Sequence, residues 1–159
     1  MTRADIRRAH QGGALTRARR GWYAVRETPP AVVSAARVGG ALTCVSALRV
    51  HGAWTLDDGP LHVRVASGVR VDRHLDAVLH WTPERVGPGL DTVEAALDAA
   101  TRCLDFRSLV VVVDSIANRR VLPGVTLEAI LRQSARGRRA LAALDQRAEP
   151  GTETLVRLA

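Results

Sequence analysis

The first residues of the chain have the spacing of a short helix. In "TRADIRRAHQ", residues 2–11, two apolar positions form a thin stripe. Thr2 is a typical N-cap, and Asp5 three positions later matches a capping box; a Gly-Gly pair follows and ends the segment. Three polar residues recur at helical spacing on one exposed face: Arg3, Arg7 and Gln11. The pattern predicts a capped helix that exposes arginines.

After the Gly-Gly pair, the period of the pattern changes from helical to alternating. The alternation "LTRAR" starts at Leu15, a turn follows at Arg20–Gly21, and the chain returns as "WYAV" from Trp22. Alternation on both sides of a short Gly-containing turn predicts a two-stranded hairpin. In such a hairpin we expect Arg17 and Arg19 to share one face, while Leu15 and Trp22 pack inward or along the hairpin.

The next part of the chain returns to helical spacing. Pro29–Pro30 begins a predicted helix, "AVVSAARVG", which ends at Gly39–Gly40. "TCVSALRVHGAW" predicts a second helix that buries Leu48 and ends at Gly52. In a chain with 3% aromatic residues, we expect the large side chain of Trp54 to be buried between this helix and the following strand.

A β segment and a run of helices follow. "LHVRVA", residues 61–66, alternates apolar residues facing inward with His62 and Arg64 facing outward, as in a half-buried strand. "AVLHWT", residues 77–82, is a second candidate strand. The four valines of "FRSLVVVVDSIANRR" would suit a buried strand, but the continuation of this segment favours a helix. Further predicted helices are "DTVEAALDAATRCL", "TLEAILRQSA", "RGRRALAALD" and the start of one in "GTETLVRLA".

Positive charge is concentrated at the N-terminus. The formal net charge is +7, and every basic residue is an arginine. Seven arginines and one acid, Asp5, lie between the start of the chain and Arg26, so these 26 residues carry +6 and the other 133 carry +1. A general basic surface would be spread more evenly, so the distribution indicates a local patch aimed at an anion. The exclusive use of arginine suits either a GC-rich genome or selection for bidentate recognition.

Candidate catalytic and metal-binding motifs are sparse. The five histidines form no HxxxH or HExxH pattern, and Cys44 and Cys103 have no partner at ligand spacing. His62 and His80 become cross-strand neighbours if their strands pair, but we expect surface or satisfied histidines. GxGxxG after a strand, GxxxxGK[ST] and GxSxG are absent from the sequence. We therefore expect no catalytic residue, no metal and no cofactor, and we expect Asp114 to cap a helix or pair with an arginine.

The overall composition fits one domain with a core of Ala, Val and Leu. The chain has 159 residues, of which 47% are hydrophobic. It has no apolar run of the roughly 18 residues that a membrane span needs, and its N-terminus lacks the apolar stretch of a secretory signal. With two cysteines and no disulfide framework, we expect a cytoplasmic protein that does not bind membranes. The cluster "RQSARGRR", residues 132–139, either extends a basic surface or is a solvated turn between helices.

Several segments together resemble a known group of actinobacterial proteins. They are, in order, "RRGWYAV", "LTCVSALRVHGAW", "LHVRV", "LVVVVDSIANRRVL" and "RAEPGTETLVRLA". These proteins join a winged-helix module similar to AbiEi-like antitoxins to a nuclease domain similar to very-short-patch-repair endonucleases. The resemblance implies that the winged helix is abbreviated here to its recognition helix and wing. It also implies that the end of the chain is the start of a nuclease domain, with Glu149 or Glu153 at the place of an active-site acid. Because the sequence has no lysine and that nuclease class needs an acid-x-Lys pair around a metal, we expect no enzymatic activity.

These observations predict an α+β protein in three parts. Residues 1–27 form the abbreviated winged-helix element, 28–148 a mixed helix and short-sheet domain of AbiEi-like type, and 149–159 a terminal helix. The expected function is duplex DNA binding, as an antitoxin or transcription regulator. The alternative is a protein-interaction module, antitoxin-like or phage-derived, that binds a toxin or host protein; the oligomeric state is open between monomer and homodimer. The residues expected to bind DNA are Arg3, Arg7, Arg8, Gln11, Arg17, Arg19, Arg20, Trp22 and Tyr23.

Overall fold

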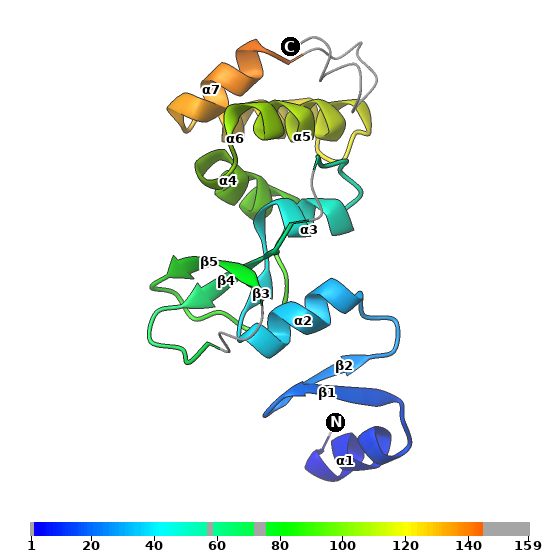
Figure 1. Cartoon of the computed structure of the whole chain (residues 1–159). Coiled ribbons are helices and arrows are strands. Elements are labelled where there is room, and N and C mark those ends of the chain that lie inside the picture. The colour runs from blue at the N-terminus through cyan, green and yellow to red at the C-terminus, as the bar shows by residue number, and fades with distance from the viewer. Residues whose placement is uncertain (1, 57–58, 72–75, 145–159) are drawn as a thin grey trace.

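The structure, a computed structural model, describes residues 2–56, 59–71 and 76–144. It is an α+β fold, as the sequence predicts. Helix α1 (Arg3–Gln11) and the hairpin of β1 (Leu15–Arg19) and β2 (Trp22–Val25) come first. Figure 1 shows these elements at one end of the molecule, a four-stranded sheet with α2 and α3 in the middle, and the later helices at the other end. The terminal segment 149–159, with Glu149 and Glu153, lies outside the described residues.

Helix α1 begins with the capping box that the sequence predicts. The backbone N–H of Asp5 donates to the hydroxyl of Thr2 at 3.2 Å, and the Asp5 carboxylate accepts from the backbone N–H of Thr2 at 2.7 Å. These bonds satisfy donors that the first turn of a helix leaves without partners. The helix has no buried residue, so its position depends on local bonds and on the adjoining hairpin.

A β-bulge in the hairpin changes the direction of one arginine. Arg17 lies opposite Tyr23, but Arg19 lies opposite Trp22, because the register shifts between Arg17 and Arg19. Tyr23 and Trp22 are consecutive residues of one strand and therefore point to opposite faces. The expectation that Arg17 and Arg19 share a face is thus wrong: Arg17 accompanies the exposed Tyr23, and Arg19 accompanies the half-buried Trp22.

The four-stranded sheet has the order β5-β4-β3-β6. Both predicted strands are present, as β4 (Leu61–Ala66) and β5 (Ala77–Thr82), and they pair in parallel. The sheet also contains two strands of two residues each, β3 (Ala41–Leu42) and β6 (Gly89–Leu90). Strand β3 pairs antiparallel with β4 and parallel with β6. Strands this short have no periodicity, which is why the sequence did not predict them.

The helices of the described residues follow the predicted order. They are α2 (Pro30–Val38), α3 (Cys44–Val50), α4 (Val93–Cys103), α5 (Phe106–Asn118), α6 (Gly124–Leu131) and α7 (Ala135–Ala142). The ambiguous valine-rich segment is helical, as predicted, and is α5. Its four valines are all buried, as is Asp114. The buried hydrophobic core of the described residues consists almost entirely of Ala, Val, Leu and Ile, and no helix among them is long and apolar enough to cross a membrane.

Two predictions of burial are wrong. Trp54 is only half-buried, and the neighbouring Ala53 occupies the core position after the turn at Gly52. The backbone N–H of Trp54 donates to the Ser115 hydroxyl at 2.6 Å. His62, expected to face outward, is 9% exposed, because the end of α4 lies against that face of β4. The face of β4 that has the polar residues in the sequence is therefore also covered by protein.

Candidate nucleic-acid interface

The polar residues predicted on α1 are exposed. Arg3, Arg7, Arg8 and Gln11 all face solvent, and the guanidinium of Arg8 lies 3.9 Å from the Asp5 carboxylate in a solvent-exposed pair. Within the described part of the chain, Arg3 and Arg7 have neither an ion-pair nor a hydrogen-bond partner. At 100° per residue, Arg7 and Gln11 lie opposite the half-buried Ile6 and Ala9. Helix α1 therefore directs polar side chains away from the hairpin that supports it.

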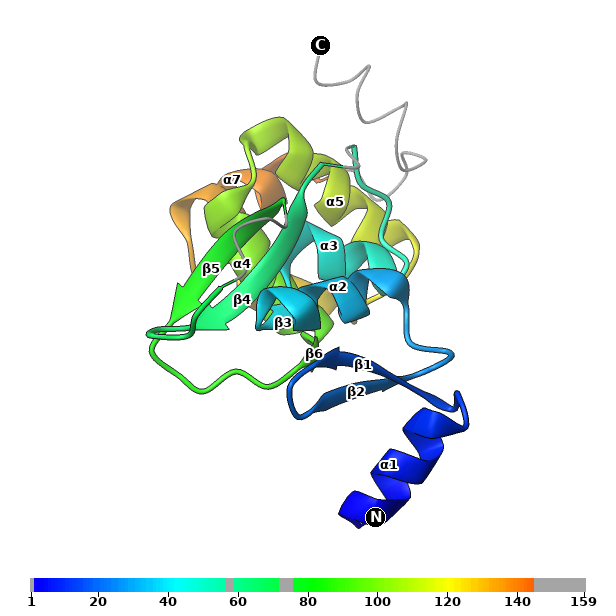
Figure 2. The same ribbon diagram turned by 60° about the horizontal axis from the view of Figure 1, so that its bottom comes forward.

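Helix α1 is seated on the hairpin by its last turn. The Nδ1 atom of His10 lies 2.9 Å from the backbone oxygen of Leu15. The His10 ring also meets the Tyr23 ring edge-on, with 5.7 Å between the ring centroids. Tyr23 thus supports α1 from the outer face of the hairpin. Figure 2 shows the resulting arrangement, in which the hairpin lies between α1 and the rest of the molecule.

The three arginines predicted on the wing have different surroundings. Arg17 and Arg20 are exposed, and Arg17 Nε makes a long hydrogen bond of 3.5 Å to the Arg19 carbonyl. Arg19 is half-buried and donates to the carbonyls of Val38 at 3.4 Å and Arg70 at 2.8 Å.

Arg19 also lies over a ring of the return strand. Its guanidinium carbon is 5.9 Å from the centroid of the Trp22 ring, within the range of a cation–π contact. Arg19 and Trp22 thus anchor the hairpin to the end of α2 and to the loop after β4. The sequence does not distinguish the role of Arg19 from the roles of Arg17 and Arg20, because no residue pattern marks the bulge that turns the Arg19 side chain inward.

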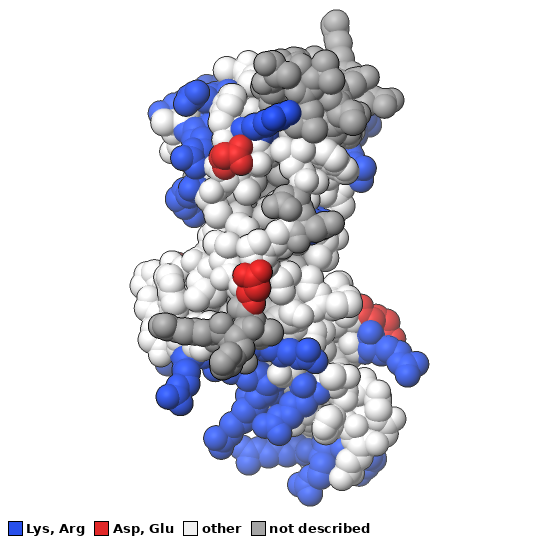
Figure 3. Space-filling model, viewed as in Figure 1, with Lys and Arg blue, Asp and Glu red and all other residues white. Residues whose placement is uncertain are grey.

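Figure 3 shows arginine side chains gathered at the end of the molecule that holds α1 and the hairpin, and a second group at the opposite end. The second basic segment, residues 132–139, differs because its arginines are engaged by the protein. Arg136 donates to the carbonyls of Arg102 at 3.3 Å and Leu104 at 2.7 Å, at the end of α4. The guanidinium of Arg139 lies 4.9 Å from the centroid of the Phe106 ring. Of the two remaining arginines of the segment, Arg132 forms an ion pair with Glu128. Arg138 donates to the Arg132 carbonyl. This segment therefore holds helices together.

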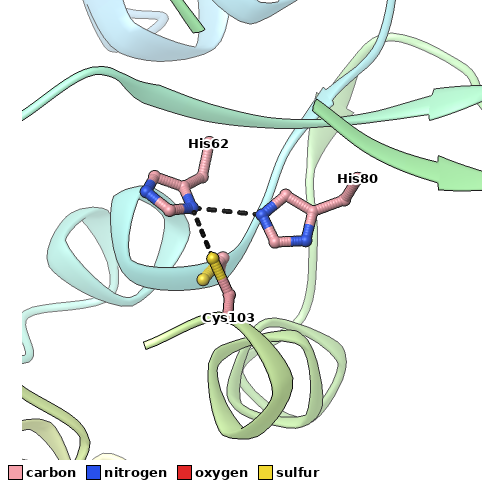
Figure 4. Close-up of side chains that lie close together, drawn as sticks. His62, His80 and Cys103 are labelled. Atoms are coloured by element: carbon pink, nitrogen blue, oxygen red, sulfur yellow. Dashed lines mark hydrogen bonds between the residues drawn. The ribbon is translucent and has the colours of Figure 1, made fainter. Parts of the chain in front are cut away.

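A second polar cluster was missed by the sequence analysis. Cys44, His62, His80 and Cys103 each contribute one ligand-type atom, and these four atoms lie within 4.8 Å of one another. The Nδ1 atom of His62 lies 3.1 Å from Nε2 of His80 and 3.6 Å from Sγ of Cys103 (Figure 4). The four residues come from four elements and have no motif spacing. The only sequence signal was one histidine on each of two candidate strands.

Burial governs the ionisation of this cluster. Burial, with a further contribution from His80, lowers the pKa of His62 to about 4. Burial also lowers the pKa of His80, so both imidazoles are neutral at neutral pH. Burial and the neighbouring Cys103 raise the pKa of the Cys44 thiol to about 12. Cys44, His62 and His80 are therefore uncharged at neutral pH.

No protein-family model, no curated protein and no solved structure matches this chain.

Proposed function

We propose that this chain is a small duplex-DNA-binding protein of the antitoxin or transcription-regulator type, which binds DNA with α1 and the β1–β2 hairpin. One observation carries the proposal: seven of the first 26 residues are arginine against a single acid, and they lie on an exposed end of the fold. Arginine side chains without acidic partners repel one another unless solvent or an anion balances them. A polyanion with regularly spaced phosphates meets that requirement.

The dimensions of α1 support this type of partner. A helix with its side chains is about 10–12 Å across, so a major groove about 12 Å wide accepts it. The nine residues of α1 then extend about 13 Å along the helix axis. Because α1 has no buried residue, it can enter the groove without unfolding from a core. Arg3, Arg7 and Gln11 then face base edges, since arginine pairs with guanine and glutamine with adenine in the major groove. Arg8 lies nearer to phosphate.

The hairpin supplies contacts to the DNA backbone in this proposal. Arg17 and Arg20 are the exposed arginines of the wing, so they are the ones that neutralise phosphates. Tyr23 supports α1 and Trp22 packs with Arg19, so these three residues position the interface. The resemblance of the chain to antitoxin-type winged-helix modules supports this division and the choice of the regulator class.

The salt dependence of binding to a fluorescent duplex tests the proposal. If four or five arginines neutralise phosphates, the logarithm of the binding constant falls against the logarithm of salt concentration with a slope of about −4. The double variant Arg17→Ala/Arg20→Ala should flatten that slope by about two units, and it should weaken binding to all duplexes alike. The matched control is Arg107→Ala/Arg120→Ala, which removes the same charge from exposed residues near the two ends of α5, at the far end of the molecule.

Selection of preferred duplexes from a random pool separates base contacts from phosphate contacts. Replacing Arg3 or Arg7 by alanine should relax the preference for individual bases by roughly 1–3 kcal/mol, with a smaller change for non-preferred duplexes. If the wing variant and its control change the slope equally, or if neither changes it, the N-terminal surface does not bind DNA. Retention of one acidic protein by the wild-type chain and not by the wing variant would then support the protein-interaction alternative.

A further inference from the structure

The cluster of two cysteines and two histidines has no role in the proposed DNA interface. Two of its contacts converge on one atom, Nδ1 of His62, which meets both His80 Nε2 and Cys103 Sγ. A ring nitrogen has either one proton or one lone pair, so it cannot form a full hydrogen bond with each neighbour. A cation at the centre of the cluster would accept electron pairs from all four atoms at once. We propose that Cys44, His62, His80 and Cys103 form a Zn²⁺-binding site.

The distances match the edges of a tetrahedral zinc site. With Zn–N bonds near 2.0–2.1 Å and Zn–S bonds near 2.3 Å, neighbouring ligand atoms of a tetrahedron lie about 3.3–3.8 Å apart. The His62–His80 distance is 3.1 Å and the His62–Cys103 distance is 3.6 Å, and no pair of the four ligand atoms exceeds 4.8 Å. The two measured distances therefore lie close to the edge lengths of an occupied site.

The backbone holds the ligands from four directions. Cys44 is the first residue of α3, His62 and His80 lie on the paired strands β4 and β5, and Cys103 is the last residue of α4. Cys44 has a φ of +51°, in the left-handed region that is costly for a residue with a β-carbon. Such strain is found at ligand clamps, where the surrounding structure over-determines the conformation.

The donor set selects the metal. Thiolate and imidazole ligands in a 2:2 tetrahedral arrangement are typical of zinc, whereas Mg²⁺ and Ca²⁺ require oxygen ligands. Two thiolates neutralise the charge of a divalent ion, so the occupied site adds no net charge to a part of the fold that also contains Arg49 and Arg102. Four protein ligands leave no open coordination position. The site is therefore structural, and it fastens α3 and α4 to the face of the sheet.

The experiment measures metal content and coordination in the full chain without a polyhistidine tag. The protein is expressed in zinc-supplemented medium and purified with a reductant. Elemental analysis should find about one Zn²⁺ per chain. After chelation, titration with Co²⁺ should saturate at one equivalent, with the strong visible absorption of tetrahedral cobalt and a thiolate-to-cobalt charge-transfer band.

Two variants and one control locate the site. His80→Ala and Cys103→Ser change half-buried ligands, so they test the site even if substitutions at the buried Cys44 and His62 prevent folding. Each should lower zinc content roughly tenfold or more and remove the thiolate–cobalt band or shift it to weaker absorption. His10→Ala, on the distant α1, should keep full zinc content. A wild-type chain that binds neither zinc nor cobalt overturns the proposal, and so does zinc retained at the wild-type level in both ligand variants.

Discussion

Replacing Asp91 with asparagine tests the connection between the sheet and the helical end of the molecule. The Asp91 side chain is 4% exposed, and that of Arg64 on β4 is 31% exposed. Arg64 Nε donates to the two carboxylate oxygens at 3.2 and 2.9 Å, and Nη2 adds a third short bond. The backbone of Asp91 is bonded as well, since its N–H donates to the Leu42 carbonyl and its carbonyl lies 2.8 Å from His51 Nε2.

The charge of Asp91 is present at neutral pH. Burial raises the pKa of this carboxyl, but the hydrogen bonds and charge of Arg64 act in the opposite direction, and the net pKa lies below the ordinary value of 3.8. The asparagine variant therefore removes a real negative charge and leaves Arg64 without its partner, while the size of the side chain is kept.

The cost follows from the burial of the pair. Removing one partner of a fully buried ion pair costs about 3–5 kcal/mol, mostly because the other charge is left desolvated. Arg64 is about one third exposed, so water can solvate part of its charge and we expect a loss of about 2–3 kcal/mol. In a domain of this size one kcal/mol corresponds to roughly 2–4 °C in Tm, so Asp91→Asn should melt about 4–12 °C below wild type.

Thermal and urea unfolding at pH 7 check this expectation. The matched control is Asp98→Asn, which breaks a largely exposed pair with Arg102 on α4 and should cost less than about 0.5 kcal/mol. A double-mutant cycle with Arg64→Met should give a coupling free energy of about 2 kcal/mol. If Asp91→Asn melts with Asp98→Asn, or if the cycle is additive, the pair does not hold the sheet to the loop before α4.

Other consequences of the structure can be measured independently. A β-carbon on Gly40 would lie 2.0 Å from the Arg64 carbonyl oxygen, so Gly40→Ala should lower the free energy of unfolding by about 3 kcal/mol in chemical denaturation. Gly124→Ala is the control: its β-carbon meets no atom within 4 Å, so this variant should be neutral or slightly stabilising. Hydrogen bonds from the backbone and hydroxyl of Thr2 lower the pKa of Asp5. The stabilisation of α1 by the capping box is therefore fully present above the unfolded-state pKa near 3.8, and it is lost as pH falls through the lower pKa of the folded state. An NMR titration of Asp5 with a midpoint above 3.8 would contradict the capping geometry. Finally, the purified chain with Mg²⁺ or Mn²⁺ should leave plasmid and mismatched duplexes uncut, and cleavage by repeatedly repurified protein would contradict the expectation that it is not an enzyme.

Local residue patterns were enough to predict most of the helices and strands and the position of the excess positive charge. The capped helix α1, the hairpin and the longer helices were predictable because capping, alternation and helical spacing act over a few residues. The valine-rich α5 was predictable for the same reason, since its continuation has helical periodicity. The excess of arginines in the first 26 residues is visible without knowledge of the fold, and it is the basis of the proposed DNA interface.

Contacts between residues that are distant in the sequence depend on the tertiary structure. The two-residue strands β3 and β6 exist because β4 offers a partner to β3 and β3 offers one to β6, and a pair of residues has no period of its own. The bulge that sends Arg19 toward Val38 depends on the register between two strands. The Cys44–His62–His80–Cys103 cluster required the parallel pairing of β4 with β5 and the packing of α3 and α4 on one face. Side-chain proximity across elements is a property of packing, and the linear order of residues contains it only where a motif has fixed spacing.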